Sequence, residues 1–147
     1  MKRKYLSIIS LLLILCCCLS VQAFATDAVP SEPVDPIDPA EPFVDIAFYN
    51  CGLIINSSGK ASCSSFAQTA HSNYNIYINI ALYRYKDGYW QNYAGPWSGS
   101  GTQFAYVDKD YYVVPGYYYC VGSAVTVQTS TGSFVESATL YSPVKYY

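Results

Sequence analysis

Apolar and polar side chains alternate with a period of two residues along most of the second half of the chain. From Tyr74 to Leu82 every second residue is a tyrosine, isoleucine or leucine, and a similar alternation runs from Tyr117 to Val127. A period of two is typical of a β-strand with one buried face, whereas a helix repeats its apolar positions every three or four residues. The pattern therefore predicts strands and no helix in the segment that follows residue 42.

Short clusters of glycine, proline, asparagine, aspartate and serine separate these runs and indicate turns. The clusters lie at residues 56–59, 87–88, 98–101, 115–116 and 130–132. We expect strands near residues 43–49, 51–56, 60–67, 74–86, 89–94, 103–114, 117–129 and 133–141. Seven or eight short strands with frequent turns predict an all-β fold, an antiparallel β-sandwich of immunoglobulin-like architecture over residues 43–147. In that architecture, the strands at 74–86 and 117–129 are neighbours.

The first 25 residues have the features of an export signal. Three basic residues at positions 2–4 precede an apolar run at 6–19, and an Ala-Phe-Ala sequence at 23–25 fits a cleavage site between small residues. The apolar run is shorter than the roughly 20 residues that a membrane-spanning helix needs. We expect residues 1–25 to be a signal peptide, the mature protein to be secreted and extracellular, and no membrane span to remain after cleavage.

Residues 26–42 have the composition of an acidic, proline-rich linker. Proline occurs at every third position from Pro30 to Pro42, and an acidic residue precedes four of these prolines. Polyproline II has three residues per turn, so we expect an extended, solvated spacer with its prolines along one edge. At about 3.1 Å per residue, the segment from Pro30 to Pro42 reaches roughly 40 Å.

Three cysteines follow the predicted signal peptide, and an oxidising compartment permits one disulfide among them. If residues 56–58 form a three-residue loop with Gly59 in the left-handed conformation, Cys51 lies directly opposite Cys63. We favour this pair.

The alternative disulfide joins Cys63 to Cys120, like the inter-sheet bridge of immunoglobulin domains. Tyr118, two residues before Cys120, has the spacing of the tyrosine corner of those domains. Against this pairing, Cys120 shares a strand face with the polar Thr126 and Gln128 and not with the valines.

Tyrosine is the most unusual feature of the composition, with 17 tyrosines in 147 residues. Strand alternation places many of these rings on the face that does not form the core. Exposed rings on two neighbouring strands predict a contact surface for an extracellular glycan or protein. The candidate binding residues are Tyr77, Tyr83, Tyr85 and Tyr118, with Trp97 on a loop. The alternative is that the rings only pair across strands and stabilise the sheet.

The position of Trp90 depends on the turn before it. A two-residue turn at Asp87-Gly88 pairs Trp90 with Tyr85 on the outer face. A three-residue loop with Gly88 as a bulge pairs it with Arg84 and directs it inward. The sequence leaves both possibilities open.

Composition and charge exclude several classes of function. Residues 43–147 carry five basic and five acidic side chains, and this balance argues against a nucleic-acid partner, which requires a basic surplus. The single histidine, His71, has no identifiable nucleophile beside it, and no Cys/His spacing fits zinc. We therefore expect no catalytic residue, no metal and no cofactor.

Two rival classes stay open beside a binding domain. A secreted hydrolase would need paired carboxylates, for which Asp108 and Glu136 are the residues to test. A small toxin or bacteriocin-like protein is the other class, although no cationic amphipathic helix is evident in the sequence.

Five short aromatic and turn motifs occur between residues 51 and 147. They are Gly-Lys-Ala-Ser-Cys at 59–63, Leu-Tyr-Arg-Tyr-Lys-Asp-Gly-Tyr-Trp at 82–90, Pro-Gly-Tyr-Tyr-Tyr at 115–119, Gly-Ser-Phe-Val-Glu at 132–136 and Tyr-Ser-Pro-Val-Lys-Tyr at 141–146. In these motifs the chain resembles an uncharacterised family of small secreted proteins of Gram-positive Firmicutes, in which we expect arginine more often at the position of Cys120. The resemblance implies export and a β-rich domain, and it implies no known activity. Together, these observations predict a secreted, non-catalytic domain used for binding or adhesion.

Overall fold

The computed structural model describes residues 43–147, and these residues form eight β-strands and no helix. The predicted signal peptide (1–25) and linker (26–42) lie outside the described residues. The strands are β1 (Ile46–Ile55), β2 (Lys60–Thr69), β3 (Asn75–Lys86), β4 (Tyr89–Thr102), β5 (Phe104–Tyr112), β6 (Tyr118–Gln128), β7 (Phe134–Tyr141) and β8 (Lys145–Tyr146).

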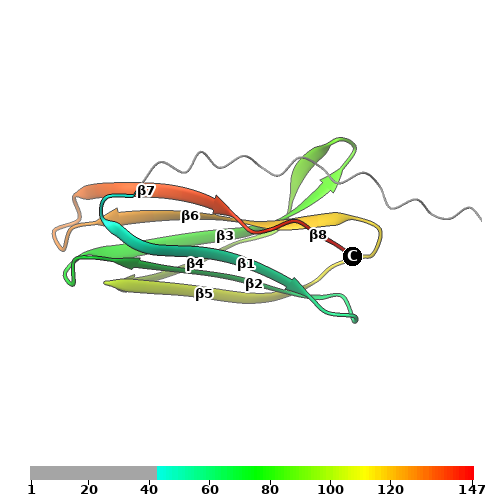
Figure 1. Ribbon diagram of the computed structural model, residues 1–147, viewed down its shortest axis with the longest axis horizontal. Helices are drawn as coiled ribbons and strands as arrows, with labels where there is room; N and C mark the ends of the chain where they lie inside the picture. Colours follow the sequence, from blue (N-terminus) through cyan, green and yellow to red (C-terminus); the bar gives the residue numbers. More distant parts are fainter. Residues whose placement is uncertain (1–42) are drawn as a thin grey trace, which may run out of the picture. The chain divides into compact units, whose positions relative to one another are not determined.

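The strands form two antiparallel sheets that pack as a sandwich, which confirms the predicted fold class. One sheet has the order β1-β2-β5, and the other has the order β4-β3-β6-β7, with β8 also paired to β6. This is an immunoglobulin-like arrangement, because strands one, two and five share one sheet while strands three, six and seven share the other. Figure 1 shows the strands of both sheets running lengthwise side by side, with the tip of the β3–β4 hairpin projecting beyond them. The expected pairing of β3 with β6 is confirmed.

The core lies between the sheets and is built by the predicted alternation. Ile76, Ile78, Ile80 and Leu82 of β3 are almost completely buried, as are Val121, Val125 and Val127 of β6. The facing positions of β2 carry the small residues Ala61, Cys63 and Ala67, which are also buried. Small side chains on one sheet thus leave room for the large ones on the other, as close packing requires.

Two predicted strand boundaries are wrong. The strands expected at 43–49 and 51–56 are one strand, β1, and the turn expected at 98–101 lies inside β4. The glycines at 99 and 101 are needed for another reason: a Cβ on Gly99 would lie 2.6 Å from the carbonyl oxygen of Tyr106, and one on Gly101 would clash with the carbonyl of Phe104. A glycine in a strand often marks such a close approach of another backbone.

The tyrosine corner is formed by Tyr119 and not by Tyr118. The Tyr119 side chain is fully buried, and its hydroxyl donates a hydrogen bond to the carbonyl oxygen of Val114, 2.8 Å away in the β5–β6 connection. Burial raises the pKa of the Tyr119 phenol to about 12. The corner therefore depends on an inward-facing tyrosine, one position after the one that the sequence suggested.

Candidate functional site

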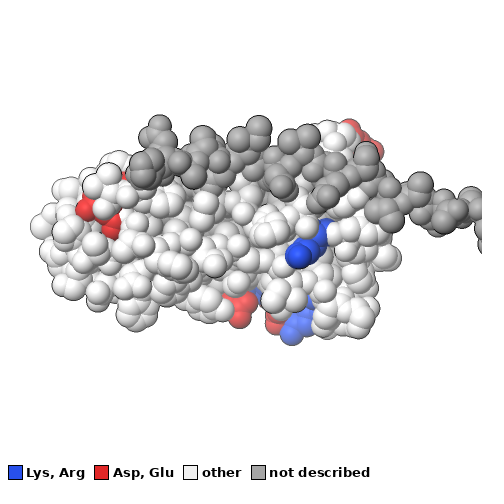
Figure 2. All heavy atoms as spheres, in the orientation of Figure 1, with Lys and Arg blue, Asp and Glu red and all other residues white. Residues whose placement is uncertain are grey.

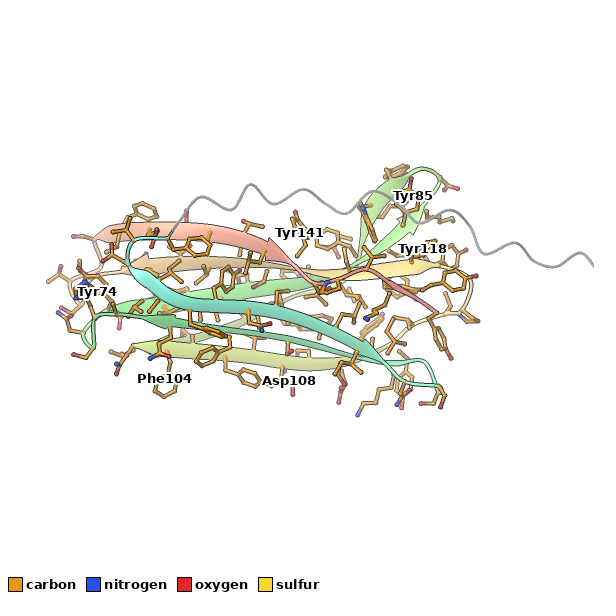
Figure 3. All side chains as sticks on the ribbon, in the orientation of Figure 1. Tyr74, Tyr85, Phe104, Asp108, Tyr118 and Tyr141 are labelled. Atoms are coloured by element: carbon orange, nitrogen blue, oxygen red, sulfur yellow. The ribbon has the colours of Figure 1, made fainter. Side chains whose placement is uncertain are left out.

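The outer face of the β4-β3-β6-β7 sheet carries the predicted tyrosine surface. Tyr77, Tyr83 and Tyr85 occupy outward positions of β3, and Tyr85 lies directly opposite Tyr118 of β6. Figure 3 shows Tyr85 and Tyr118 near the β3–β4 hairpin and Tyr141 farther along the sheet, on β7. The structure thus places the four predicted tyrosines on one sheet face, as expected.

Tyr118 does not have the expected exposure, because its side chain is only 7% exposed. Its ring packs against that of Tyr146, with 4.9 Å between the ring centroids. Tyr146 belongs to β8, the two-residue strand that the sequence did not predict. The covering strand removes Tyr118 from the set of residues that a ligand can contact directly.

The prediction for Trp97 is wrong in both location and direction. Trp97 lies within β4 and not on a loop, and it pairs with the buried Ile80 of β3. Its side chain therefore points to the core side of the sheet, where it packs against the core and lies 6.1 Å from the ring of Tyr111. Trp97 cannot belong to a contact surface on the opposite face.

Trp90 pairs with Tyr85 on the outer face, which is the first of the two positions that the sequence leaves open. Lys86 pairs with Tyr89 and Tyr85 pairs with Trp90, so Asp87-Gly88 is a two-residue turn. Both turn residues have positive φ, 56° for Asp87 and 89° for Gly88, as a type I′ hairpin requires. The rings of Trp90 and Tyr85 meet edge to face at 5.3 Å on the outer side.

A hollow of about 200 Å³ lies on this outer face, over its middle strands. Its central lining comes from three small residues of the two middle strands, Ala81, Gly122 and Ala124. The rings of Tyr83 and Tyr141 also line it, and their centroids are 6.3 Å apart in an edge-to-face arrangement.

Gly122 makes the hollow possible. A Cβ at this position would lie 2.8 Å from Cε2 of Tyr83 and 2.9 Å from Cε1 of Tyr141. Both rings can lie over the strand only because residue 122 has no side chain. Sequence reasoning missed Gly122 and Tyr141, although an isolated glycine within an alternating strand is a known sign of a close approach.

The polar groups around the hollow are uncharged. Asn79, Asn92 and Thr139 contribute to its lining, together with Pro96. The side chain of Asn79 is oriented by the hydroxyl of Ser98, which donates a 2.6 Å hydrogen bond to Asn79 Oδ1. The residues that line the hollow therefore offer aromatic faces, amides and hydroxyls, and no acid, base or thiol.

The two carboxylates proposed for a hydrolase are not brought together. Asp108 lies on β5 and Glu136 on β7, two strands of different sheets that do not touch each other. The Glu136 carboxylate instead accepts hydrogen bonds from the backbone N–H groups of Val44, Asp45 and Ile46, each 3.0 Å long. Glu136 is thus occupied in holding the start of β1.

The side chain of His71 contacts an aspartate and a tyrosine near the ends of two strands. Its Nε2 atom lies 3.2 Å from Asp45 Oδ1, and its ring packs on that of Tyr74 at 4.7 Å. Within residues 43–147, no cluster of three or more histidine, cysteine, aspartate or glutamate side chains is placed to hold a metal ion.

The favoured disulfide between Cys51 and Cys63 is not formed, because the β1–β2 register differs from the predicted one. Leu53 faces Cys63, and Cys51 faces Ser65, so the two cysteines are diagonal neighbours and both are free thiols. Diagonal partners in a sheet lie about 7–8 Å apart, beyond the usual Cα separation of a disulfide. The alternative bridge from Cys63 to Cys120 is also not formed, since Cys63 is free.

Asn56 causes the difference in register. Its side-chain Oδ1 accepts hydrogen bonds from the backbone N–H groups of Ser58 and Lys60, both 3.0 Å long. The backbone N–H of Asn56 also donates to the carbonyl oxygen of Lys60. The loop consequently begins one residue later than predicted, and each β1 residue faces a β2 residue two positions farther along.

We predict that Cys51 and Cys63 react slowly with iodoacetamide in the folded protein at pH 8. Burial raises the pKa of each thiol to about 12, so the reactive thiolate is scarce until the pH approaches that value. Unfolding in urea without reductant should expose both thiols to rapid alkylation, which mass spectrometry of the peptides measures. If alkylation of Cys51 and Cys63 required a reductant, the free-thiol assignment would be wrong.

Sequence comparison identifies no family and no curated relative that could suggest a function. No family model matches the chain, and a search of curated proteins finds none similar in sequence. Among residues 43–147, no helix is long and apolar enough to cross a bilayer.

Proposed function

We propose that this protein is a secreted, non-catalytic binding domain that holds part of a glycan in the hollow on the outer face of the β4-β3-β6-β7 sheet. The observation that carries the proposal is the pairing of two tyrosine rings with a floor of small residues. Tyr83 and Tyr141 offer flat apolar faces beside Gly122, and asparagine and threonine side chains lie around them.

The chemistry of the lining favours a sugar over a charged or wholly apolar ligand. A sugar ring has C–H groups that pack on aromatic faces and hydroxyls that hydrogen-bond to amides, and the lining supplies both kinds of partner. No charged side chain lines the hollow, so it offers no counter-ion to a phosphate or a carboxylate. Its volume of about 200 Å³ is below the 300–1,000 Å³ typical of drug-sized ligands, which suits one sugar unit of a longer chain.

The N-terminal sequence supports an extracellular role. Residues 1–25 have the arrangement of a signal peptide, and the proline-rich segment that follows has the composition of a spacer. Export and the extracellular location are part of the proposal.

We predict that Tyr141→Ala, and the double variant Tyr83→Ala with Tyr85→Ala, weaken glycan binding by about tenfold or more. Loss of one ring contact worth about 1.4 kcal/mol gives this factor. A glycan array probed with the purified protein identifies a ligand, and titration calorimetry then compares the variants with Tyr77→Ala. Tyr77 is a suitable control because it lies on the same face of β3 and does not line the hollow.

Equal affinities in correctly folded variants would remove the site assignment. The hydrolase alternative makes a different prediction, namely turnover of a glycan or peptide that Asp108→Asn or Glu136→Gln abolishes. Such turnover would replace the binding proposal with an enzymatic one.

A further inference from the structure

We infer that the outer face of the β1-β2-β5 sheet is a second binding surface, an exposed aromatic platform for the sugar rings of a neutral, insoluble polysaccharide. This platform consists of Phe48, Phe66, Phe104 and Tyr106. It lies on the sheet opposite to the hollow, and the inference does not depend on the function proposed for that hollow.

Strand register brings the four rings together on one face. Phe66 of β2 pairs with Tyr106 of β5, and the next outward position of β2, Gln68, pairs with Phe104. On the other side, the ring of Phe48 on β1 packs against that of Phe66 at 5.7 Å. Phe48, Phe66 and Tyr106 therefore lie on successive strands of this face, with Phe104 two positions before Tyr106 on β5. Figure 3 shows Phe104 projecting away from β5.

Three of these four side chains are more than half exposed to solvent. Phe48 is 51% exposed, Phe104 60% and Tyr106 56%. A half-exposed aromatic ring leaves open about half of the area that it could bury, which is about 100 Å². The four rings together therefore present roughly 300–400 Å² of apolar area. Patches of this size on a soluble domain are often functional.

The size of the platform argues against a second copy of this chain as its occupant. A standard protein interface buries about 800 Å² on each partner. The platform supplies at most about half of that area, and beyond it the same face carries serines, charged side chains and two separate apolar residues, Ile54 and Tyr112. A stable dimer through this face would bury too little apolar surface.

Charge argues against an anionic membrane or polymer. The charged residues on this face are Lys60, Asp108 and Asp110, and Lys60 Nζ is already 2.7 Å from Asp110 Oδ2. Asp108, next to Tyr106 along the outer side of β5, would repel an anion. Most of the surface in the view of Figure 2 is uncharged, and basic and acidic side chains gather in only a few places.

A neutral polysaccharide fits both the limited apolar area and the charge of this face. Its sugar rings present flat C–H faces that stack on phenyl rings without a deep pocket, and it carries no charge for Asp108 to repel. Two amides on the same sheet face, Asn50 opposite Phe66 and Gln68 opposite Phe104, can hydrogen-bond to sugar hydroxyls. Binding at two opposite faces would let one domain link two glycan chains, with the gain in avidity that multivalency gives.

The test is depletion of the purified protein from solution by microcrystalline cellulose, chitin and particulate β-1,3-glucan. The variant Phe48→Thr with Phe104→Thr should lower the association constant for the particles by about tenfold or more, because two stacking contacts are lost. Threonine suits an exposed strand position, so the fold should be retained. Tyr112→Thr is the matched control, because Tyr112 is exposed on the same face of β5 but lies outside the platform.

The outcomes separate this inference from the function proposed for the hollow. Particle binding that survives Tyr141→Ala and fails in the platform variant supports a second surface. Unchanged particle binding in the platform variant, or no particle binding by the unmodified protein, overturns it. Two further results also overturn it: a dimer in sedimentation that the platform variant dissociates, and binding to neutral phosphatidylcholine vesicles that the platform variant abolishes.

Discussion

Gly122→Ala is expected to abolish binding in the hollow and to lower the free energy of unfolding. The added methyl group would lie 2.8 Å from the Tyr83 ring and 2.9 Å from the Tyr141 ring, so both rings must move apart. Overpacking of this kind typically costs about 1–3 kcal/mol. Replacing glycine by alanine also restricts the unfolded chain, which returns about 0.4–1 kcal/mol. The net loss of stability is therefore moderate, whereas the loss of the ring arrangement removes the hollow itself.

Urea unfolding measures the first effect, and titration with the glycan identified on the array measures the second. The control variant is Gly52→Ala, also in a strand and also free of positive φ. A Cβ on Gly52 would meet only the hydroxyl oxygen of Ser64, at 3.1 Å, and that side chain can rotate away. Gly52→Ala should keep full binding and near-normal stability. Tight binding by Gly122→Ala would show that the ligand lies elsewhere.

The alternation of side chains was sufficient to predict the sandwich, because one strand face must be buried whatever the details of the loops. The isoleucines of β3 and the valines of β6 point inward as their period requires, and the two strands pair as an immunoglobulin-like order demands. Direction toward the core is a property of each strand alone. It can therefore be predicted without knowing the neighbouring strands.

The failures concern features that depend on neighbouring strands. Tyr118 was expected to be exposed, and it is covered by a two-residue strand that is too short to leave a periodic signal. The serines and glycines after Trp97 resemble a turn and so predict a loop there, whereas the glycines at 99 and 101 allow the close approach of β5. Glycine allows turns and close packing alike, and the sequence does not distinguish the two uses.

The aromatic platform escaped prediction for a related reason. In β2 the small residues Ala61, Cys63 and Ala67 face the core, and the larger Phe66 faces outward. Hydrophobicity alone would place Phe66 inside. The opposing sheet, however, fills the interior with isoleucine and valine side chains, so β2 has room only for small groups there.

Glu136→Ala is expected to destabilise the domain by on the order of 2–3 kcal/mol. Three backbone N–H groups, those of Val44, Asp45 and Ile46, lose the carboxylate that accepts their hydrogen bonds. Hydrogen bonds to a charged group contribute about 1.5–3 kcal/mol each, but these three share one acceptor and the exposed Val44 can turn to water, so the sum is smaller than three full bonds. The buried Ile46 at the start of β1 has less access to water, and its region should exchange amide hydrogens first.

Glu136→Gln should give an intermediate loss, because glutamine keeps one acceptor oxygen while its NH₂ group faces a donor. Asp108→Asn should change stability by less than about 0.5 kcal/mol, as expected for an exposed side chain. Urea unfolding of the three variants tests this order, and it also separates two roles of Glu136. If Glu136 anchors β1, each variant should lose stability in proportion to the hydrogen bonds that it loses. If Glu136 is a catalytic carboxylate, the variants should lose turnover and keep their stability. Normal stability in both Glu136 variants would contradict the anchoring role and return this residue to the hydrolase hypothesis.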